Sequence, residues 1–200
     1  DAAFWLYSSG TTGSPKGAVH LHHDMLVEAD LYSRGVLGLT ETDVSFSVAK
    51  LFFAYGLGNG LYFPLRAGAT TVLLPDRPTA EKVFEVIDRF RPTVFYSVPT
   101  SYVSLLQHAE KTGRSSLDGV RLCISAGEPL PKHTFEKWQE HFGLEILDGI
   151  GSTEILHIYI SNRPGQAVPG STGQIVPGYE AKIVDERGDP LPPGEVGTLL

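Results

Sequence analysis

The sequence predicts an α/β fold, in which a mainly parallel sheet is flanked by helices and a small β-rich subdomain follows at the C-terminal end. From Ala69 to Leu147, apolar runs of strand length alternate with amphipathic stretches of helix length. Strands joined by helices usually pair in parallel through right-handed crossovers, which predicts the parallel sheet. After Pro164 the composition shifts to glycine, proline and short strands, which predicts the β-rich end.

The elements before Ala69 begin with a hairpin. Residues 4–7 form an apolar run that predicts a buried strand, and residues 18–22 predict the strand that returns. Asp24 is expected to cap a helix that extends to about Val36, and residues 44–48 predict another strand. The histidines at positions 20, 22 and 23 lack a cysteine or a spaced carboxylate to complete a tetrahedral metal site, so we expect them to be solvated or structural.

The segment 51–60 is apolar, with small residues at intervals. It fits either a buried helix whose glycines permit close packing or the wall of an apolar ligand pocket. Its composition alone favours the helix.

The central part of the chain contains the alternating elements. Predicted strands cover residues 71–74, 93–97, 120–124 and 145–147, and predicted helices cover a stretch from Thr79 as well as residues 100–111 and 131–142. Cys123 lies within a continuous apolar strand, so we expect an inert core residue.

The C-terminal part predicts strands at residues 173–176, 180–184 and 195–199, with a hairpin turn at 185–189. We therefore expect residues 1–169 to form the α/β core and residues 170–200 to begin a β subdomain. The chain starts at Asp1 without methionine and stops within a predicted strand, so we expect it to be a piece of a larger enzyme.

Composition excludes several classes of protein. A net charge of −7 argues against a nucleic-acid partner, because no basic stripe is present to neutralise phosphates. A single cysteine excludes an internal disulfide and suits a reducing compartment. The longest uncharged apolar stretch, between Lys50 and Arg66, is broken by glycines and a proline and is too short to span a bilayer. A cytoplasmic protein with no membrane partner is the default expectation.

Residues 7–17 contain three glycines, hydroxyl side chains and Lys16. Glycines allow backbone N–H groups to form an anion-binding nest, hydroxyls add donors, and a lysine supplies a positive charge suited to a phosphate. A polyphosphate ligand is the expected occupant, and a plain surface connector is the alternative. A Walker A loop is excluded, because Pro15 precedes the lysine and Gly17 follows it.

A site is predicted where three consecutive strands end. The clusters 98–100, 125–129 and 148–154 contain glycine, hydroxyl or carboxylate groups, and each follows a predicted strand. Because ligands of open α/β sheets bind outside the carboxyl ends of the strands, these clusters should share one site.

The order of residues 7–17 resembles the signature of the adenylate-forming superfamily, which includes acyl-CoA synthetases, aryl-CoA ligases and luciferases. This resemblance implies that the loop grips the β- and γ-phosphates of ATP. The implied phosphate-binding residues are Ser8, Ser9, Gly10, Thr11, Thr12, Gly13, Ser14 and Lys16. Residues 52–59 look like the acyl-pocket segment of benzoate- and hydroxybenzoate-CoA ligases, which reverses the preference for a simple buried helix.

The resemblance also implies roles near the strand ends. Thr153 and Glu154 match the Thr-Glu pair of the family, whose threonine contacts the α-phosphate and whose glutamate binds Mg²⁺; with Lys16 they are the expected catalytic residues. The implied adenine-binding residues are Gly127, Glu128, Pro129, Asp148, Gly149 and Ile150, with isoleucine where the family often has an aromatic ring. The implied acyl pocket consists of Ala54, Tyr55, Ala126, Gly127, Gly151, His157 and Ile158.

His157 or Tyr55 could address a ring substituent or the carboxylate, although His157 could also be a packed histidine hydrogen-bonded to the backbone. An α-amino acid substrate is not expected, because the pocket segment lacks an aspartate to pair with its ammonium group.

The activity implied is that of an aryl-CoA ligase that uses ATP, Mg²⁺ and CoA to activate benzoate or a simple substituted benzoate. The alternatives are a related ligase for a non-aryl acid and a non-catalytic nucleotide-binding module. A homodimer is possible. The ribose-binding aspartate, hinge and C-terminal lysine of the family would lie beyond Leu200, so the chain alone should catalyse little.

Overall fold

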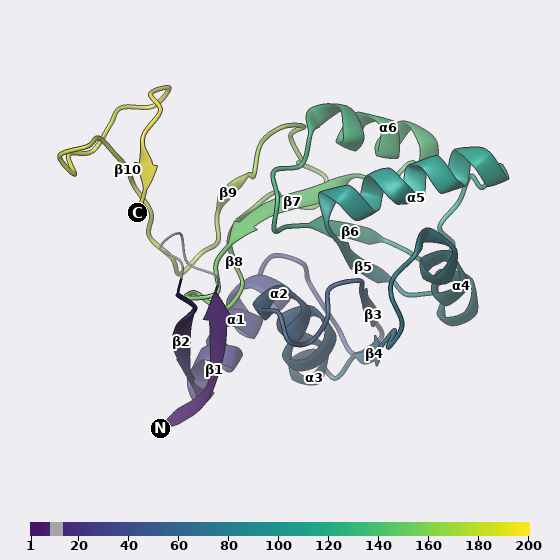
Figure 1. Ribbon diagram of the computed structural model, residues 1–200, viewed down its shortest axis with the longest axis horizontal. Helices are drawn as coiled ribbons and strands as arrows, with labels where there is room; N and C mark the ends of the chain where they lie inside the picture. The colour runs from purple at the N-terminus through teal and green to yellow at the C-terminus, as the bar shows by residue number, and fades with distance from the viewer. Residues whose placement is uncertain (9–13) are drawn as a thin grey trace.

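A seven-stranded sheet forms the centre of the computed structural model, which describes residues 1–8 and 14–200 (Figure 1). Its strand order is β4-β3-β5-β6-β7-β8-β9; the first five strands are parallel, and β8 and β9 are antiparallel. The strands are β3 (Val44–Ser47), β4 (Thr70–Val72), β5 (Val94–Ser97), β6 (Leu122–Ser125), β7 (Ile146–Gly151), β8 (Ile158–Ser161) and β9 (Gln174–Ile175). The predicted fold class is confirmed.

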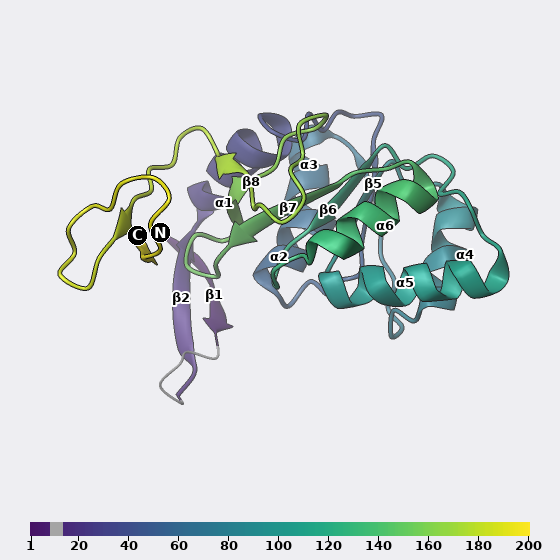
Figure 2. The same cartoon turned by 90° about the horizontal axis from the view of Figure 1, so that it is seen from above.

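Helices cover both faces of this sheet. They are α1 (His22–Glu28), which continues as the π-helical segment η1 (Ala29–Arg34), α2 (Ala54–Leu57), the π-helical η2 (Gly58–Tyr62), α3 (Phe63–Ala67), α4 (Ala80–Phe90), α5 (Pro99–Thr112) and α6 (Lys132–Phe142). Figure 2 shows α4, α5 and α6 on one side of the sheet and α1 and α3 on the other. The sheet is therefore the middle layer of three.

Alternate residues of the strands enter two hydrophobic cores. Phe95 and Cys123 pack with α4, α5 and α6, whereas their neighbours Tyr96 and Ile124 pack with η1 and α3. This alternation follows from the two-residue period of a strand, and burial on both faces explains the continuous apolar runs. Burial also raises the pKa of the Cys123 thiol to about 12, which fits the expected inert core residue.

The N-terminal hairpin differs from its prediction. β1 (Ala2–Ser8) pairs antiparallel with β2 (Lys16–Leu21), so the hairpin itself is confirmed. The expectation of a buried strand at residues 4–7 is wrong, because Trp5 and Tyr7 are 59% and 74% exposed. Trp5 lies opposite Val19, which is also exposed, so one face of the hairpin is apolar and open.

The predicted start is correct for α4 but not for α1. The helix predicted to begin at Thr79 is α4, and Thr79 is its N-cap, since its Oγ1 accepts a hydrogen bond from the Lys82 amide. Asp24 is not the cap of α1, because the helix begins at His22 and Asp24 is its third residue. From that position its carboxylate accepts a hydrogen bond of 2.7 Å from the Leu21 amide. The carboxylate still stabilises the helix start, but two residues inside it.

The C-terminal half also differs in detail. β7 extends through Gly151, into residues expected to form a turn, and β8 was not predicted. β9 joins the main sheet, whereas β10 (Ile183–Val184) and β11 (Thr198–Leu199) form a separate two-stranded sheet. The turn at 185–189 is present, with the Asp185 side chain accepting the Arg187 and Asp189 amides. The domain division at residue 170 stays a prediction.

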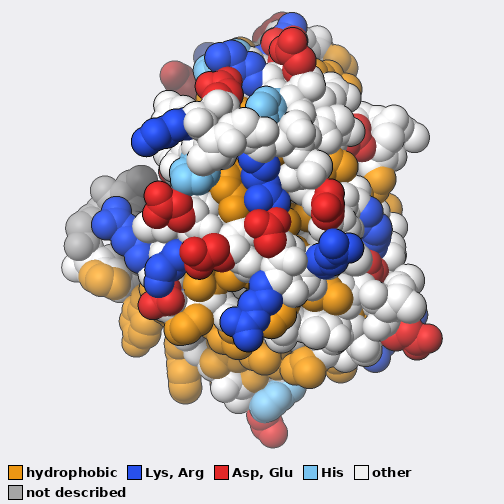
Figure 3. Space-filling model, turned by 90° about the vertical axis from the view of Figure 1, so that its right-hand side faces the viewer, with side chains coloured by type: hydrophobic (Ala, Val, Ile, Leu, Met, Phe, Trp, Pro, Cys, Tyr) orange, Lys and Arg blue, Asp and Glu red, His pale blue; other side chains and the backbone are white. Residues whose placement is uncertain are grey.

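The surface over the helices is mixed in charge. On the face seen in Figure 3, acidic and basic side chains are interspersed. Within the described residues, no helix has the length and apolar character needed to cross a membrane.

An ion pair between the buried Asp43 carboxylate and the exposed Arg121 ties the amino ends of the parallel strands together. Arg121, just before β6, donates from Nε and Nη2 to the two carboxylate oxygens of Asp43, each at 2.9 Å. Thr93, just before β5, adds a bond of 2.6 Å to the same carboxylate. Burial alone would raise the pKa of Asp43, but these hydrogen bonds and the Thr40 amide outweigh it and lower the pKa to about 2. The pair thus holds three strands in register at one edge.

We expect Arg121→Ala to lower the free energy of unfolding by about 2 kcal/mol at pH 7, because it leaves the Asp43 carboxylate buried without its main partner. Denaturant unfolding measures this. The loss should shrink as pH falls from about 4 toward 2, since Asp43 then becomes protonated in the native protein. The control is Arg34→Ala, whose exposed pair with Asp30 should contribute below about 0.5 kcal/mol; equal losses in the two variants would contradict the assignment.

Candidate active site

A pocket of about 840 Å³ lies at the carboxyl ends of β5, β6 and β7. It is where the sequence placed a site, because the ends of neighbouring parallel strands meet there. The structure brings all the expected acyl-pocket residues to this pocket, from four separate segments: Ala54, Tyr55, Ala126, Gly127, Gly151, His157 and Ile158. Their function in binding an acid stays a prediction.

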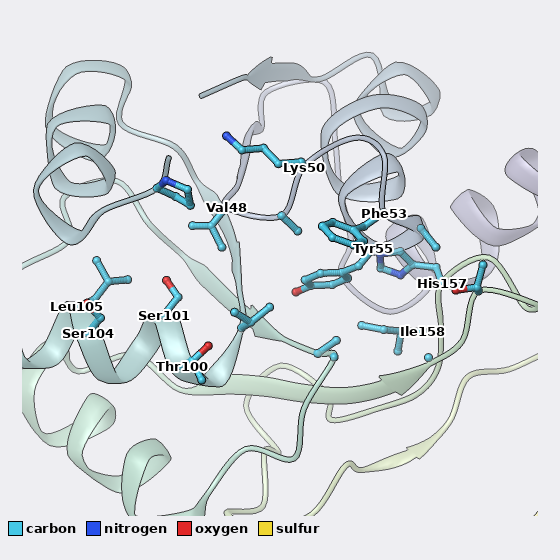
Figure 4. Close-up of a pocket in the computed structure, with 18 of the residues that line it drawn as sticks. Val48, Lys50, Phe53, Tyr55, Thr100, Ser101, Ser104, Leu105, His157 and Ile158 are labelled. Atoms are coloured by element: carbon cyan, nitrogen blue, oxygen red, sulfur yellow. The ribbon is translucent and has the colours of Figure 1, made fainter. Parts of the chain in front are cut away.

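The pocket has an aromatic side and a polar side. Figure 4 shows Phe53, Tyr55 and His157 gathered on one side and Thr100 and Ser101 of α5 on the other. The aromatic groups make a flat apolar wall, whereas the hydroxyls offer hydrogen bonds. Such a cavity suits a ligand with one apolar and one polar end.

Tyr55 is held in place by the sheet. Its hydroxyl lies 3.2 Å from the carbonyl oxygens of Ser97 and Ile124, at the ends of β5 and β6. A buried tyrosine hydroxyl that donates to backbone carbonyls has a restricted position, so the ring forms a fixed wall.

His157 is a packed residue and a pocket residue at once. It is 2% exposed, and its Nε2 lies 3.0 Å from Asn59 Oδ1. The Tyr55 ring stacks on it at 5.3 Å, and Phe63 meets it edge-on at 4.6 Å. Burial lowers the pKa of His157 to about 3, so the ring is neutral near pH 7. Its side-chain partner is Asn59.

The turn between β7 and β8 carries Thr153 and Glu154. A Cβ on Gly151 would lie 2.3 Å from the His157 carbonyl oxygen, so only glycine allows the strands to approach this closely. The Ser152 amide donates to the same carbonyl at 3.2 Å. Leu156, which is buried, has a φ of +80°, a conformation that costs about 1 kcal/mol or more for a non-glycine residue and is enriched at functional sites.

The N-terminal hairpin contacts this turn. His20 of β2 is 3% exposed, and its Nε2 lies 2.8 Å from the Thr153 carbonyl oxygen. Thr153 in turn lines the pocket. The hairpin that carries the predicted phosphate loop is thus joined to the Thr-Glu turn by a half-buried contact.

The predicted phosphate-binding residues are only partly described. Ser8 lies opposite Lys16 at the loop end of the hairpin, and Ser14 and Lys16 are exposed. Ser9, Gly10, Thr11, Thr12 and Gly13 lie outside the described residues. Of the described hairpin residues, none is among those that line the pocket.

The predicted adenine-binding residues divide into two groups. Gly127, Glu128 and Pro129 are exposed in the turn after β6, and Gly127 has a φ of +92°. Asp148 and Gly149 are buried within β7. Burial raises the pKa of Asp148 to about 6. Among the six predicted residues, which also include Ile150, Gly127 is the one that lines the pocket.

Several pocket residues were missed by the sequence analysis. Lys50, Arg77, Ser101 and Ser104 also line the pocket, and Asn59 contacts His157, whereas Thr100 belongs to the predicted cluster 98–100. The hydroxyls could have been found, because α5 begins immediately after the carboxyl end of β5. Glu154, the expected Mg²⁺ ligand, is exposed. Residues 1–8 and 14–200 contain no cluster of three or more metal-binding side chains. The expectation that the histidines at 20, 22 and 23 bind no metal stays a prediction.

Comparison with known proteins identifies relatives along the whole chain. The AMP-binding enzyme family matches residues 1–200. A benzoate–CoA ligase of Thauera aromatica is 55% identical over 188 residues, covering 94% of this chain and 36% of that protein. A 4-hydroxybenzoate–CoA/benzoate–CoA ligase of Rhodopseudomonas palustris is 45% identical over 200 residues, covering 100% of this chain and 37% of that protein. The chain thus spans a little over a third of these relatives.

Solved structures agree with this result. A benzoate CoA ligase from Burkholderia xenovorans LB400 superposes with a TM-score of 0.92 at 52% identity, covering 100% of this chain and 40% of that chain. The anthranilate CoA ligase AuaEII in complex with anthranoyl-AMP superposes with a TM-score of 0.93 at 46% identity, covering 100% and 38%.

We expect His20→Ala to loosen the hairpin from the Thr153 turn. The substitution leaves the half-buried Thr153 carbonyl without its partner, which costs about 1 kcal/mol locally. Hydrogen exchange of the β2 amides in the full-length protein should therefore become about tenfold faster. His23→Ala is the control, because the His23 side chain is 66% exposed. Identical exchange in the two variants would show that His20 does not hold the hairpin.

Proposed function

Because this chain belongs to the AMP-binding enzyme family, we propose that it forms part of an aryl-CoA ligase. The full protein would convert benzoate or a simple substituted benzoate, with ATP and CoA, into the aryl-CoA thioester, AMP and pyrophosphate. The main observation behind this proposal is that all the residues expected to bind an aromatic acid line one and the same pocket. The similarity to proteins named as benzoate–CoA ligases supports it.

The chemistry explains what the site has to provide. A carboxylate is a poor acyl donor, because its anionic oxygen is a poor leaving group. Attack of that oxygen on the α-phosphorus of ATP forms an acyl-adenylate and releases pyrophosphate, and a thiol then displaces AMP. Catalysis of the first step depends mainly on positioning and charge neutralisation.

The aromatic side of the pocket is the proposed binding site for the acid. Ala126, Gly127 and Gly151 have little or no side chain, which leaves room for a flat ring. Tyr55 and His157 offer the ring an aromatic wall. A volume of about 840 Å³ is larger than a benzoate needs, so the same cavity can also admit part of a nucleotide or a thiol.

The phosphates are proposed to lie between the hairpin and the Thr153 turn. Lys16 would contribute positive charge, and the Thr153 hydroxyl would donate to the α-phosphate. The adenine would lie against Gly127, Glu128 and Ile150. The contact between His20 and Thr153 supports this arrangement, because it keeps the hairpin beside the turn.

Mg²⁺ is the proposed metal. It commonly takes one or two protein carboxylates together with phosphate oxygens and water, so a single exposed carboxylate at Glu154, next to Thr153, fits it. When bound, the metal would neutralise phosphate charge.

ATP–pyrophosphate exchange on the full-length protein tests the proposal, using a panel of benzoate, hydroxybenzoates, cinnamate and short aliphatic acids. We expect exchange with benzoate or a substituted benzoate. Exchange with aliphatic acids alone would remove the aryl assignment but keep the ligase. No exchange with any acid, together with retained ATP binding, would favour a non-catalytic nucleotide-binding module.

Two substitutions test the proposed residues. Lys16→Ala should lower the adenylation rate about 10²-fold, since it removes a charge that stabilises the transition state. Glu154→Gln should shift the Mg²⁺ titration to higher concentration. Lys132→Ala, an exposed lysine of α6, is the control and should change neither. Unaltered rates and Mg²⁺ dependence in the first two variants would remove these roles.

A further inference from the structure

A buried carboxyl group lies behind the pocket wall. Glu28 at the end of α1 is 1% exposed. Its position follows from helical spacing, because Met25, Glu28, Ala29 and Tyr32 share the face that packs on the sheet. An acidic residue on an apolar helix face is uncommon, since burying a charge is costly unless it is paired or neutralised.

The two oxygens of Glu28 have different surroundings. The Tyr179 hydroxyl donates to Oε2. Oε1 makes no hydrogen bond, and it lies 3.8 Å from His157 Nδ1, which also has no partner. Glu28 therefore lies between the segment that contains Tyr179 and the pocket residue His157.

The hydrogen bonds of His157 decide which ring nitrogen is free. Asn59 donates from Nδ2 to Ser47 Oγ at 3.3 Å, so its Oδ1 is the atom that faces His157. Oδ1 is an acceptor, so His157 Nε2 must carry the ring proton. Nδ1 of a neutral His157 is then a bare acceptor facing the carboxyl group of Glu28. Two buried acceptors in this arrangement repel each other unless one proton lies between them.

We propose that Glu28 is a positioning residue of the pocket, which carries a proton where its carboxyl group faces His157 Nδ1 and so keeps the wall behind the bound acid uncharged. Its role in acid binding rests on the proposed function. A neutral carboxyl group facing Nδ1 favours this orientation of the His157 ring and, through stacking, that of Tyr55, because the two acceptors no longer repel each other. Protonation also removes a negative charge that would repel the carboxylate of the substrate.

Electrostatics at Glu28 support this arrangement. Burial raises its pKa to about 7, against a smaller opposing effect of the Tyr179 hydrogen bond. Burial lowers the pKa of His157, so the proton of the pair resides mainly on the carboxyl group. Five titratable groups lie near Glu28: Asp24 of α1, Tyr32 of η1, Tyr62 of η2, His157 just before β8 and Tyr179 after β9. Of the described residues, no lysine or arginine is among the groups that shift the pKa of Glu28, so no positive charge favours its carboxylate.

The kinetic experiment compares the full-length protein with its Glu28→Gln variant in ATP–pyrophosphate exchange. The amide of glutamine can donate to His157 Nδ1 and accept from Tyr179, but it does not titrate. We expect the KM for benzoate of the unaltered protein to rise about tenfold between pH 6.5 and 8.5. The Glu28→Gln variant should keep a low KM that does not change over this range. The control is Glu136→Gln, an exposed glutamate of α6, which should keep the unaltered pH profile.

A second experiment needs no activity. Glu28 titrates near pH 4.5 in the unfolded chain and near 7 in the native protein, so its contribution to stability is present below pH 4.5 and is lost as pH rises to 7. The Tm of the unaltered protein should therefore fall, relative to that of Glu28→Gln, across this window.

The outcomes separate the two proposals. A KM of the unaltered protein that follows the same pH course as that of Glu28→Gln, or a Tm difference that is constant from pH 4.5 to 7, would overturn the role of a protonated Glu28. Absence of exchange with aromatic acids would overturn the proposed function, and the Tm comparison would still decide whether Glu28 holds the proton.

Discussion

The close approach of β7 and β8 at Gly151 is the contact on which the candidate site depends. A side chain at position 151 would collide with the His157 carbonyl. Because glycine has none, the antiparallel strand β8 can pair with β7 immediately after a short turn. That turn places Thr153 beside the hairpin and His157 against Tyr55. A single glycine thus sets the distance between the part of the site proposed for phosphates and the part proposed for the acid.

The pocket wall is supported by polar groups that are buried or half-buried. The Tyr55 hydroxyl is held by carbonyls of two strands, and His157 is held by Asn59, which in turn contacts Ser47 of β3. Networks of this kind specify one arrangement of side chains, because each broken bond leaves a buried group without a partner. They connect the aromatic wall to the centre of the sheet, and we infer that they keep the cavity shape constant before a ligand enters.

Much of the fold could be predicted from the sequence, because local and tertiary signals agree there. The cap at Thr79 and the apolar face of α4 are examples. The exposed face at Trp5 and the strand β8 could not be predicted, since hydrophobic periodicity does not reveal what a strand faces or that a chain reverses after Gly151. The grouping of the acyl-pocket residues followed from a family resemblance. Glu28 is recognisable in the sequence as a charged residue on the same helix face as Met25 and Tyr32. Its partners Tyr179 and His157 are distant in sequence, so only the folded structure identifies them.

The hairpin formed by β1 and β2 has a practical consequence for work with these 200 residues. Indole, phenol and aliphatic groups of Trp5, Tyr7, Val19 and Leu21 stand in water along one ribbon. We expect such a strip to adhere to other copies at the millimolar concentrations used in spectroscopy, which would scatter light and broaden resonances. Dilute samples, or a mild detergent that coats the strip, will report the single molecule more faithfully.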